Sequence, residues 1–93
     1  MMKTITIGII GDFDKTKSSH PATNEALQHA AALLSLGIKI DWLPTLSFKK
    51  KSVKTTIVQY QGLFASPGTY RNMEGAIKGI RLAREMNIPF MGT

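Results

Sequence analysis

The stretch that most constrains the fold is TITIGII, residues 4–10. It is apolar or β-branched almost throughout and is followed by Gly11-Asp12. A short run of this kind, bounded by turn residues, is typical of a strand that is buried on both faces of a parallel sheet. The stretch therefore predicts an α/β protein in which helices cover the sheet.

A helix is predicted directly after this strand. From Ser18 the chain reads SSHPATNEALQHAAALLSLG, in which serines can cap the helix and Pro21 suits its first turn. Gly37 is placed to end this helix in a left-handed conformation. The segment IKIDWLP, residues 38–44, then alternates apolar and polar side chains and stops at a proline, which indicates an edge strand.

Two further strands and a short helix are expected in the second half of the chain. Residues 45–60 have apolar side chains at helical spacing and predict the short helix. GLFAS, residues 62–66, predicts the third strand, and IPFMG, residues 88–92, predicts the fourth.

A longer helix is predicted between the third and fourth strands. Asn72 can cap its start, Glu74 places a negative charge in its first turn, and Asn87 can end it. The expected apolar stripe consists of Met73, Ala76, Ile77, Ile80 and Ala83.

The alternation of strands and helices predicts βαβ units with right-handed crossovers. In the flavodoxin-like arrangement the strand order is 2-1-3-4, and the topological switch point lies between the first and third strands. The loops at residues 11–20 and 66–72 then meet at the carboxyl ends of these strands, where a ligand is expected. The fourth strand has no following helix in the sequence, so a partner or a longer domain is expected to cover it.

Composition narrows the classes of function. The 93 residues are 43% hydrophobic and indicate one globular domain, and no apolar run approaches the roughly 18 residues that cross a bilayer. With no secretory signal, a cytoplasmic location without membrane contact is expected. The absence of cysteine excludes disulfides, zinc–thiolate sites and a cysteine nucleophile within these residues.

The net charge of +6 raises the possibility of a nucleic-acid-binding protein. However, Lys49, Lys50, Lys51 and Lys54 form one short run without interleaved aromatic residues. Such a run favours a solvated surface over a nucleic-acid site.

The turn Ser66-Pro67-Gly68 is the leading candidate site. A glycine between a strand and a helix lets backbone N–H groups face the crevice, where they can stabilise an oxyanion. The alternative is that Pro67-Gly68 only makes the turn. Arg71 can bind a carboxylate or lie at the surface, and neither a P-loop nor a dinucleotide-binding motif is present.

Other polar residues favour structural roles. Asp12 and Asp14 lie in the first loop without a third metal ligand in reach, which favours turn formation and capping over a metal pair. His20 and His29 do not have a metal-ligand spacing and are expected to be structural or exposed. Trp42 is expected to pack on the edge strand, and no metal or cofactor is predicted.

The run SPGTYRNMEGAIKGIRLAREMNIPFMGT, residues 66–93, resembles the stretch before the catalytic cysteine in class I glutamine amidotransferase domains, in particular that of CTP synthases. The opening IGIIGDFD and the helix after it are similar to the start of the same domain. The matching residues are Pro67, Gly68, Arg71, Glu74, Gly75, Ala83, Arg84, Glu85, Ile88, Pro89, Phe90 and Gly92.

The resemblance implies that residues 1–93 are the amino-terminal part of a single domain that hydrolyses glutamine to glutamate and ammonia. It places Gly68 and Thr69 in the oxyanion loop, with Tyr70 and Arg71 as the other substrate-binding candidates. The cysteine nucleophile is expected immediately after Thr93, followed later by a histidine and a glutamate. The chain is thus expected to be truncated before the nucleophile elbow and to be inactive alone.

One departure from the family is visible. CTP synthases have two glycines and a phenylalanine where this chain has Ser66-Pro67-Gly68-Thr69-Tyr70. A non-catalytic module that binds a small ligand or a protein is therefore the alternative. Glutamine or a similar small molecule is the expected ligand, nucleic acid is not expected, and a homo-oligomer would cover the fourth strand.

Overall fold

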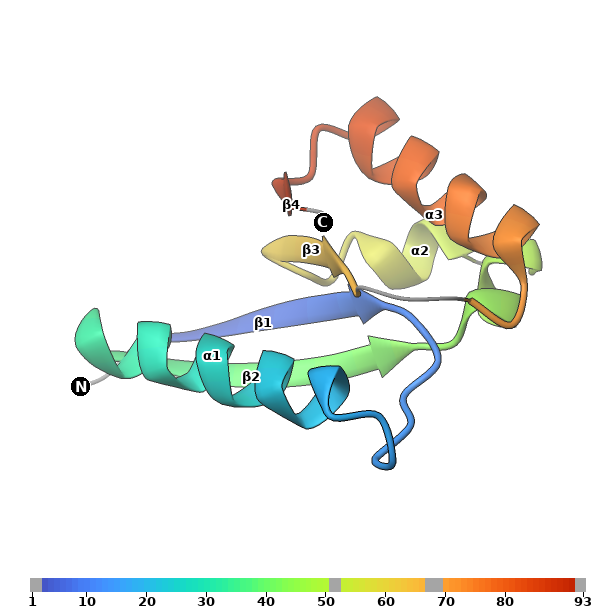
Figure 1. Ribbon diagram of the computed structural model, residues 1–93. Coiled ribbons are helices and arrows are strands. Elements are labelled where there is room, and N and C mark those ends of the chain that lie inside the picture. Colours follow the sequence, from blue (N-terminus) through green and yellow to red (C-terminus); the bar gives the residue numbers. More distant parts are fainter. Residues whose placement is uncertain (1–2, 51–52, 67–69, 92–93) are drawn as a thin grey trace.

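A computed structural model describes residues 3–50, 53–66 and 70–91 of the chain. Strands and helices alternate along these residues, with one short 3-10 helix, η1 (Figure 1). The elements are β1 (Lys3–Ile10), α1 (Ser19–Leu33), β2 (Leu36–Leu43), η1 (Thr45–Lys49), α2 (Val53–Ile57), β3 (Gly62–Ala65), α3 (Met73–Glu85) and β4 (Phe90–Met91).

The four strands form one parallel sheet in the order β2-β1-β3-β4, which confirms the predicted α/β, flavodoxin-like topology. β1 is central, and Ile10 at its end is in register with Leu43 of β2 and Ala65 of β3. The predicted edge position of β2 is also confirmed. The carboxyl ends of β1, β2 and β3 therefore lie side by side.

The helices cover both faces of the sheet (Figure 1). On one face, α1 packs against β2, and the Trp42 indole N–H donates a hydrogen bond of 2.8 Å to Asn24 Oδ1. On the other face, η1, α2 and α3 pack around Ile10 and Leu43. Successive side chains of a strand point to opposite faces, so neighbouring residues such as Trp42 and Leu43 serve different layers.

The larger core lies between the sheet and the layer of η1, α2 and α3. Phe48 of η1 and Ile57 of α2 are almost fully buried there, together with Leu63 of β3. Removing each such side chain from water stabilises the fold by about 1.5–3 kcal/mol. Phe48 lies directly against Gly79 of α3, where there is little room for a larger residue.

The layer under α1 is thinner. Ile9 of β1 is fully buried, but α1 itself buries only His20 and Ala31 completely. Leu33 and Leu34 are 87% and 69% exposed, so the carboxyl-terminal end of α1 presents apolar side chains to solvent.

The ends of the helices agree only in part with those predicted from the sequence. Asn87, with φ of 55°, follows the end of α3 and confirms its predicted role. The prediction that Gly37 ends the first helix is wrong, because α1 ends at Leu33 and Ser35 takes the left-handed conformation with φ of 57°. Gly37 instead pairs within β2. Ser18 occupies the cap position of α1, but its side chain makes no capping hydrogen bond.

Burial also differs from the expected pattern in two elements. β1 is exposed at Lys3 and Thr4 and becomes fully buried only over its last three residues, Gly8–Ile10, so it is not buried along its whole length as expected. In α3, Met73 and Ile77 of the predicted stripe are 56% and 48% exposed. The helix is rotated so that Gly75 and Gly79 face η1, since only a residue without a side chain fits this close approach.

The predicted short helix within residues 45–60 is found as η1 followed by α2.

An apolar groove of about 220 Å³ lies beside β3 and β4, as expected for an uncovered fourth strand. Its lining includes Ile7, Leu27, Phe64, Phe90 and Met91. Phe90 and Met91 are 39% and 67% exposed. This part of the sheet therefore has apolar surface that no described helix buries.

Candidate functional site

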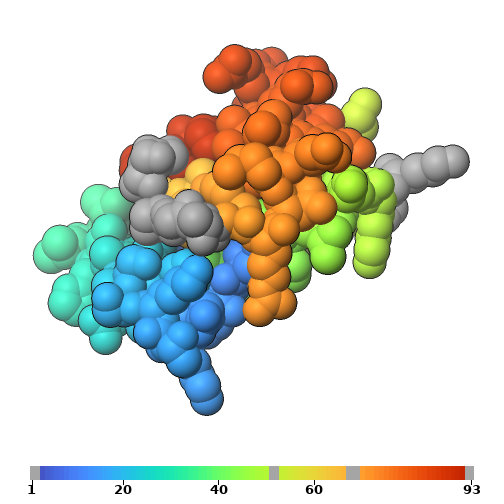
Figure 2. Space-filling model, turned by 45° about the vertical axis from the view of Figure 1, so that its right-hand side comes forward, coloured from blue at the N-terminus to red at the C-terminus, as the bar shows by residue number. Residues whose placement is uncertain are grey.

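The loops after β1, β2 and β3 leave the sheet at the same edge. The N–H of Gly11 donates to the Leu43 carbonyl at 3.1 Å, and the N–H of Ser66 donates to the Ile10 carbonyl at 3.1 Å. These two bonds keep the three strands together at the points where the loops begin. Figure 2 shows the loop after β1, in blue, beside the start of α3, in orange.

Asp12 connects the three loops. Its Oδ1 accepts a hydrogen bond of 3.0 Å from the Thr45 N–H. Its Oδ2 accepts bonds of 2.8 Å from the Thr45 hydroxyl and 2.9 Å from the Arg71 N–H. The Thr45 hydroxyl in turn accepts from the Asn72 N–H at 2.9 Å, so Asp12 and buried Thr45 together bind the backbone that leads into α3.

The environment of Asp12 favours its charged form. Partial burial acts to raise the pKa of this carboxyl group, but the hydrogen bonds from Arg71 and Thr45 and the positive charge of Arg71 hold the pKa below its ordinary value. The local turn or cap predicted for Asp12 is therefore wrong, because these partners belong to the loops after β2 and β3. The role of Thr45 could not be predicted from the sequence, because no motif or spacing around this residue indicates its contact with Asp12.

Asn72 caps α3 as predicted. Its Oδ1 accepts a hydrogen bond of 2.7 Å from the Gly75 N–H, which satisfies one of the free donors of the first turn. Glu74 lies in this first turn, where its charge interacts favourably with the helix dipole. The start of α3 is thus fixed both by its own cap and by the Asp12–Thr45 pair.

The candidates Tyr70 and Arg71 lie at this edge of the sheet. The Tyr70 hydroxyl donates a hydrogen bond of 2.7 Å to the Ser66 carbonyl, and burial raises the pKa of Tyr70 despite this bond. Arg71 is exposed and lines a cavity of about 210 Å³ together with Asp12, Asp14, Lys17 and Tyr70. The other candidates, Gly68 and Thr69, lie with Pro67 outside the described residues.

Asp14 makes a local turn, as predicted. Its Oδ1 accepts hydrogen bonds of 2.9 Å from the Thr16 N–H and 2.6 Å from the Thr16 hydroxyl. These bonds hold the pKa of Asp14 below its ordinary value. The Asp14 N–H donates to Nδ1 of His20 at 2.9 Å, so Asp14 also connects the loop to the start of α1.

His20 and Trp42 also have the structural roles expected of them. His20 is only 2% exposed, and its ring lies 4.8 Å from the Trp42 ring, with Phe13 against both. His29 is exposed on α1. Among the residues that the structure describes, no three histidine, aspartate or glutamate side chains gather as a metal site.

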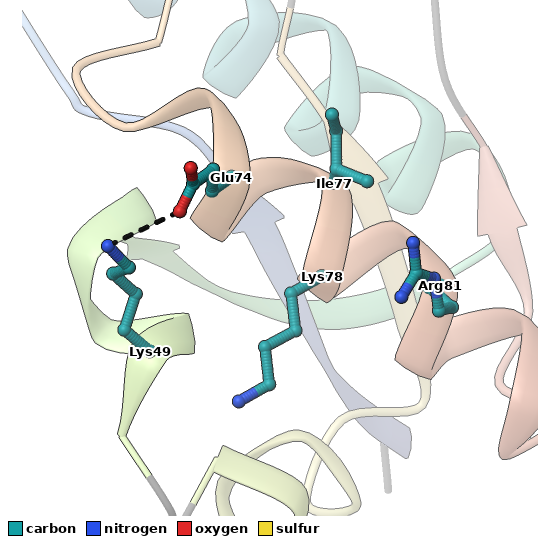
Figure 3. A pocket seen from close by; sticks show the side chains of 5 residues that line it. All are labelled: Lys49, Glu74, Ile77, Lys78 and Arg81. Atoms are coloured by element: carbon teal, nitrogen blue, oxygen red, sulfur yellow. Dashed lines mark ion pairs between the residues drawn. The ribbon is translucent and has the colours of Figure 1, made fainter.

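A larger hollow, of about 420 Å³, lies between η1 and α3, and it shares no lining residue with the cavity at Tyr70 and Arg71 (Figure 3). Lys49, Lys78 and Arg81 surround it, and Lys49 pairs with Glu74 at 3.5 Å. The two paired side chains are 50% and 85% exposed, and an ion pair in solvent contributes little to stability or specificity. No described helix is long and apolar enough to cross a membrane.

Comparisons with known proteins agree with the sequence resemblance. No protein-family model matches the chain. The CTP synthase of Saccharolobus solfataricus is 36% identical over 93 residues, which cover 97% of this chain and 17% of that protein. The CTP synthase of Sulfolobus acidocaldarius is 34% identical over 92 residues, again 97% of this chain and 17% of that protein. The chain therefore spans about a sixth of the length of these relatives.

A solved structure shows the same fold. The Trypanosoma brucei CTP synthase glutaminase domain with bound acivicin matches 95% of this chain and 35% of its own, with a TM-score of 0.78 and 18% sequence identity. The resemblance stated from the sequence is thus confirmed: along nearly its whole length the chain is similar in sequence to CTP synthases, and it has the fold of part of a CTP synthase glutaminase domain.

Proposed function

We propose that the chain is the amino-terminal part of a glutaminase domain and contributes the loop side of a site that hydrolyses glutamine to glutamate and ammonia. The convergence of the loops after β1, β2 and β3 around Asp12 is the observation that carries this proposal. This edge is the switch point of the sheet, where ligands bind in folds of this type. The similarity to CTP synthases supports glutamine as the substrate.

The proposed roles follow from the chemistry of amide hydrolysis. A thiolate attacks the side-chain amide carbon, and negative charge develops on the amide oxygen. Backbone N–H groups of Gly68 and Thr69 are the proposed donors to this oxygen. The Tyr70 hydroxyl donates to the Ser66 carbonyl, and Arg71 is proposed to bind the substrate carboxylate through its guanidinium group.

The nucleophile has to come from outside these residues, because the sequence contains no cysteine. We therefore propose that the 93 residues do not hydrolyse glutamine alone, and that the cysteine follows Thr93 in the complete domain. The groove beside β3 and β4 supports this view, since its exposed Phe90 and Met91 offer apolar surface to a further segment of the same domain.

The proposal is tested with a chain that continues past Thr93 with the downstream reading frame. We expect this longer chain to release glutamate from glutamine, and expect the same chain with the new cysteine replaced by serine to be inactive. The 93-residue chain serves as the second control and should release none. A longer chain that is folded but inactive, or one whose activity survives the loss of the cysteine, would contradict the proposal.

The alternative function is a binding or interaction module, which the same apolar groove also suits. In that case a second copy of the chain is expected to cover Phe90 and Met91, and the 93-residue chain should sediment as a dimer. A folded monomer would exclude this form of the alternative. The cytoplasmic location stays a prediction from the sequence.

A further inference from the structure

We infer that Asp12 is a positioning residue, which together with Thr45 fixes the backbone of Arg71 and Asn72 and so determines where the Arg71 side chain stands in the cavity. This inference rests on the proposed function, in which Arg71 binds the carboxylate of glutamine. Asp12 itself need not touch the substrate.

The hydrogen bonds assign this role to Asp12 specifically. One carboxylate accepts three donors, two from Thr45 and one from Arg71, although Arg71 lies 59 residues away in the sequence. Thr45 extends the contact, because its hydroxyl donates to Asp12 and accepts from the Asn72 N–H. The two residues thereby hold consecutive N–H groups of the segment that enters α3.

The position of Arg71 depends on this contact more than on its own packing. Arg71 is exposed, and the bond from its N–H to Asp12 Oδ2 is a direct link between this residue and the first loop. A carboxylate with two oxygens can accept all three donors, whereas an amide of the same shape has one oxygen and presents N–H groups. Asp12→Asn therefore keeps the size of the side chain but leaves donors of Thr45 or Arg71 without an acceptor.

Thr45 offers a second and independent perturbation. Thr45→Val keeps the shape of this fully buried side chain and removes the hydroxyl that joins Asp12 to Asn72. Thr45→Ser keeps the hydroxyl. If the hydroxyl positions the loop, Thr45→Ser should keep the KM for glutamine that Thr45→Val raises.

The test measures glutamine hydrolysis by the complete domain, that is, the chain extended past Thr93. A well-placed arginine–carboxylate contact is worth about a tenfold to hundredfold effect. We expect Asp12→Asn to raise the KM for glutamine about tenfold and to change kcat less than about threefold. Thr45→Val should act in the same direction, and Thr45→Ser should stay near the parent chain.

A double-mutant cycle separates positioning from general destabilisation. Once Arg71→Ala has removed the guanidinium group, Asp12→Asn should raise KM no further, because the two changes affect one interaction. Asp41→Asn is the matched control: this carboxylate on β2 accepts a 3.0 Å bond from the Tyr60 hydroxyl, and its loss should leave KM unchanged. Melting temperatures show whether each variant is folded at the assay temperature.

The outcomes distinguish this inference from the proposed function. If the parent domain hydrolyses glutamine but Asp12→Asn leaves KM unchanged, or if its effect adds fully to that of Arg71→Ala, the positioning role is refuted and the proposed function stands. If the folded parent domain is inactive, both are refuted. Faster amide hydrogen exchange at Arg71 in Asp12→Asn, with the raised KM and the coupling, supports the inference.

Discussion

Replacing Gly75 by alanine should destabilise the protein, because η1 approaches α3 at this residue without space for a side chain. A Cβ at Gly75 would overlap the carbonyl oxygen of Thr45 and lie 2.8 Å from its carbonyl carbon. It would also lie 3.2 Å from Oδ1 of Asn72, the cap of the helix. Thr45 is held by Asp12, so the backbone carbonyl cannot move without disturbing the bonds of the loops.

The magnitude follows from two opposing effects. Alanine is favoured over glycine in a helix by up to about 1 kcal/mol. Overpacking typically costs about 1–3 kcal/mol, and the upper part of this range applies when the neighbour is backbone. We therefore expect Gly75→Ala to lower the free energy of unfolding by about 2 kcal/mol, which corresponds to about 8–16 °C in Tm for a domain of this size.

Gly79→Ala is the matched control on the same helix. Its Cβ would lie 2.9 Å from two carbons of the Phe48 ring, and a ring can turn where a backbone carbonyl cannot. We expect a loss of about 1 kcal/mol or less, because the gain in helix propensity offsets the repacking. Both variants are compared with the parent chain by urea denaturation followed by circular dichroism. If Gly75→Ala is as stable as the parent, or more stable than Gly79→Ala, the reasoning about the close approach is refuted.

Three further predictions concern Asn72, Tyr60 and Asp12. Asn72→Ala should lower the free energy of unfolding by about 1 kcal/mol through loss of the cap, and Asn72→Ser by less; equal stability of the two variants in urea would argue against a capping role. Burial, followed by the hydrogen bond and charge of Asp41, raises the pKa of Tyr60 from 10.0 to about 12. The contribution of Tyr60 to the free energy of unfolding is therefore present below pH 10 and lost as the pH rises through about 12. Asp41→Asn should lower the pKa of Tyr60 in a titration of phenolate absorbance, and an unchanged titration curve would exclude Asp41 as a cause of the shift. The pKa of Asp12 is lowered in the folded protein, so its contribution to the free energy of unfolding is present above the unfolded pKa and lost as the pH falls through the folded pKa. Urea denaturation at decreasing pH should therefore show a smaller loss of stability in acid for Asp12→Asn than for the parent chain. An identical loss in the two chains would contradict the proposed hydrogen bonding.

The sheet could be predicted from the sequence because its signals are local. The β-branched run at residues 4–10 and the short apolar segment at residues 62–66 mark buried strands, and the alternation with helices leaves few topologies. Asn72 and Asn87 were identified because caps depend on residue type and position. The same dependence on residue type led to the wrong prediction for Gly37, because Ser35 takes the left-handed conformation two residues earlier.

The orientation of α3 could not be predicted from its hydrophobic residues. Met73 and Ile77 are more apolar than Gly75 and Gly79, yet the glycines face the protein. The reason is the distance between η1 and α3, which leaves room for a helix backbone but not for side chains. A hydrophobic pattern carries no information on such a distance.

The candidate site was predicted in part. Strand order alone brings the loops after β1 and β3 to one edge, and Tyr70 and Arg71 lie there. The bonds between Asp12, Thr45 and Arg71 join residues that are 33 and 59 positions apart, and they depend on the exact paths of three loops. No local pattern around Thr45 indicates that its hydroxyl connects two of these loops.

The central place of β1 has a consequence for how the protein is made. β1 precedes β2 and β3 in the sequence but pairs along one edge with β2 and along the other with β3. During translation its second edge stays open until Gly62–Ala65 have left the ribosome, long after α1 and β2 are complete. The nascent chain thus carries an isoleucine-rich strand with a free edge until β3 arrives and closes it.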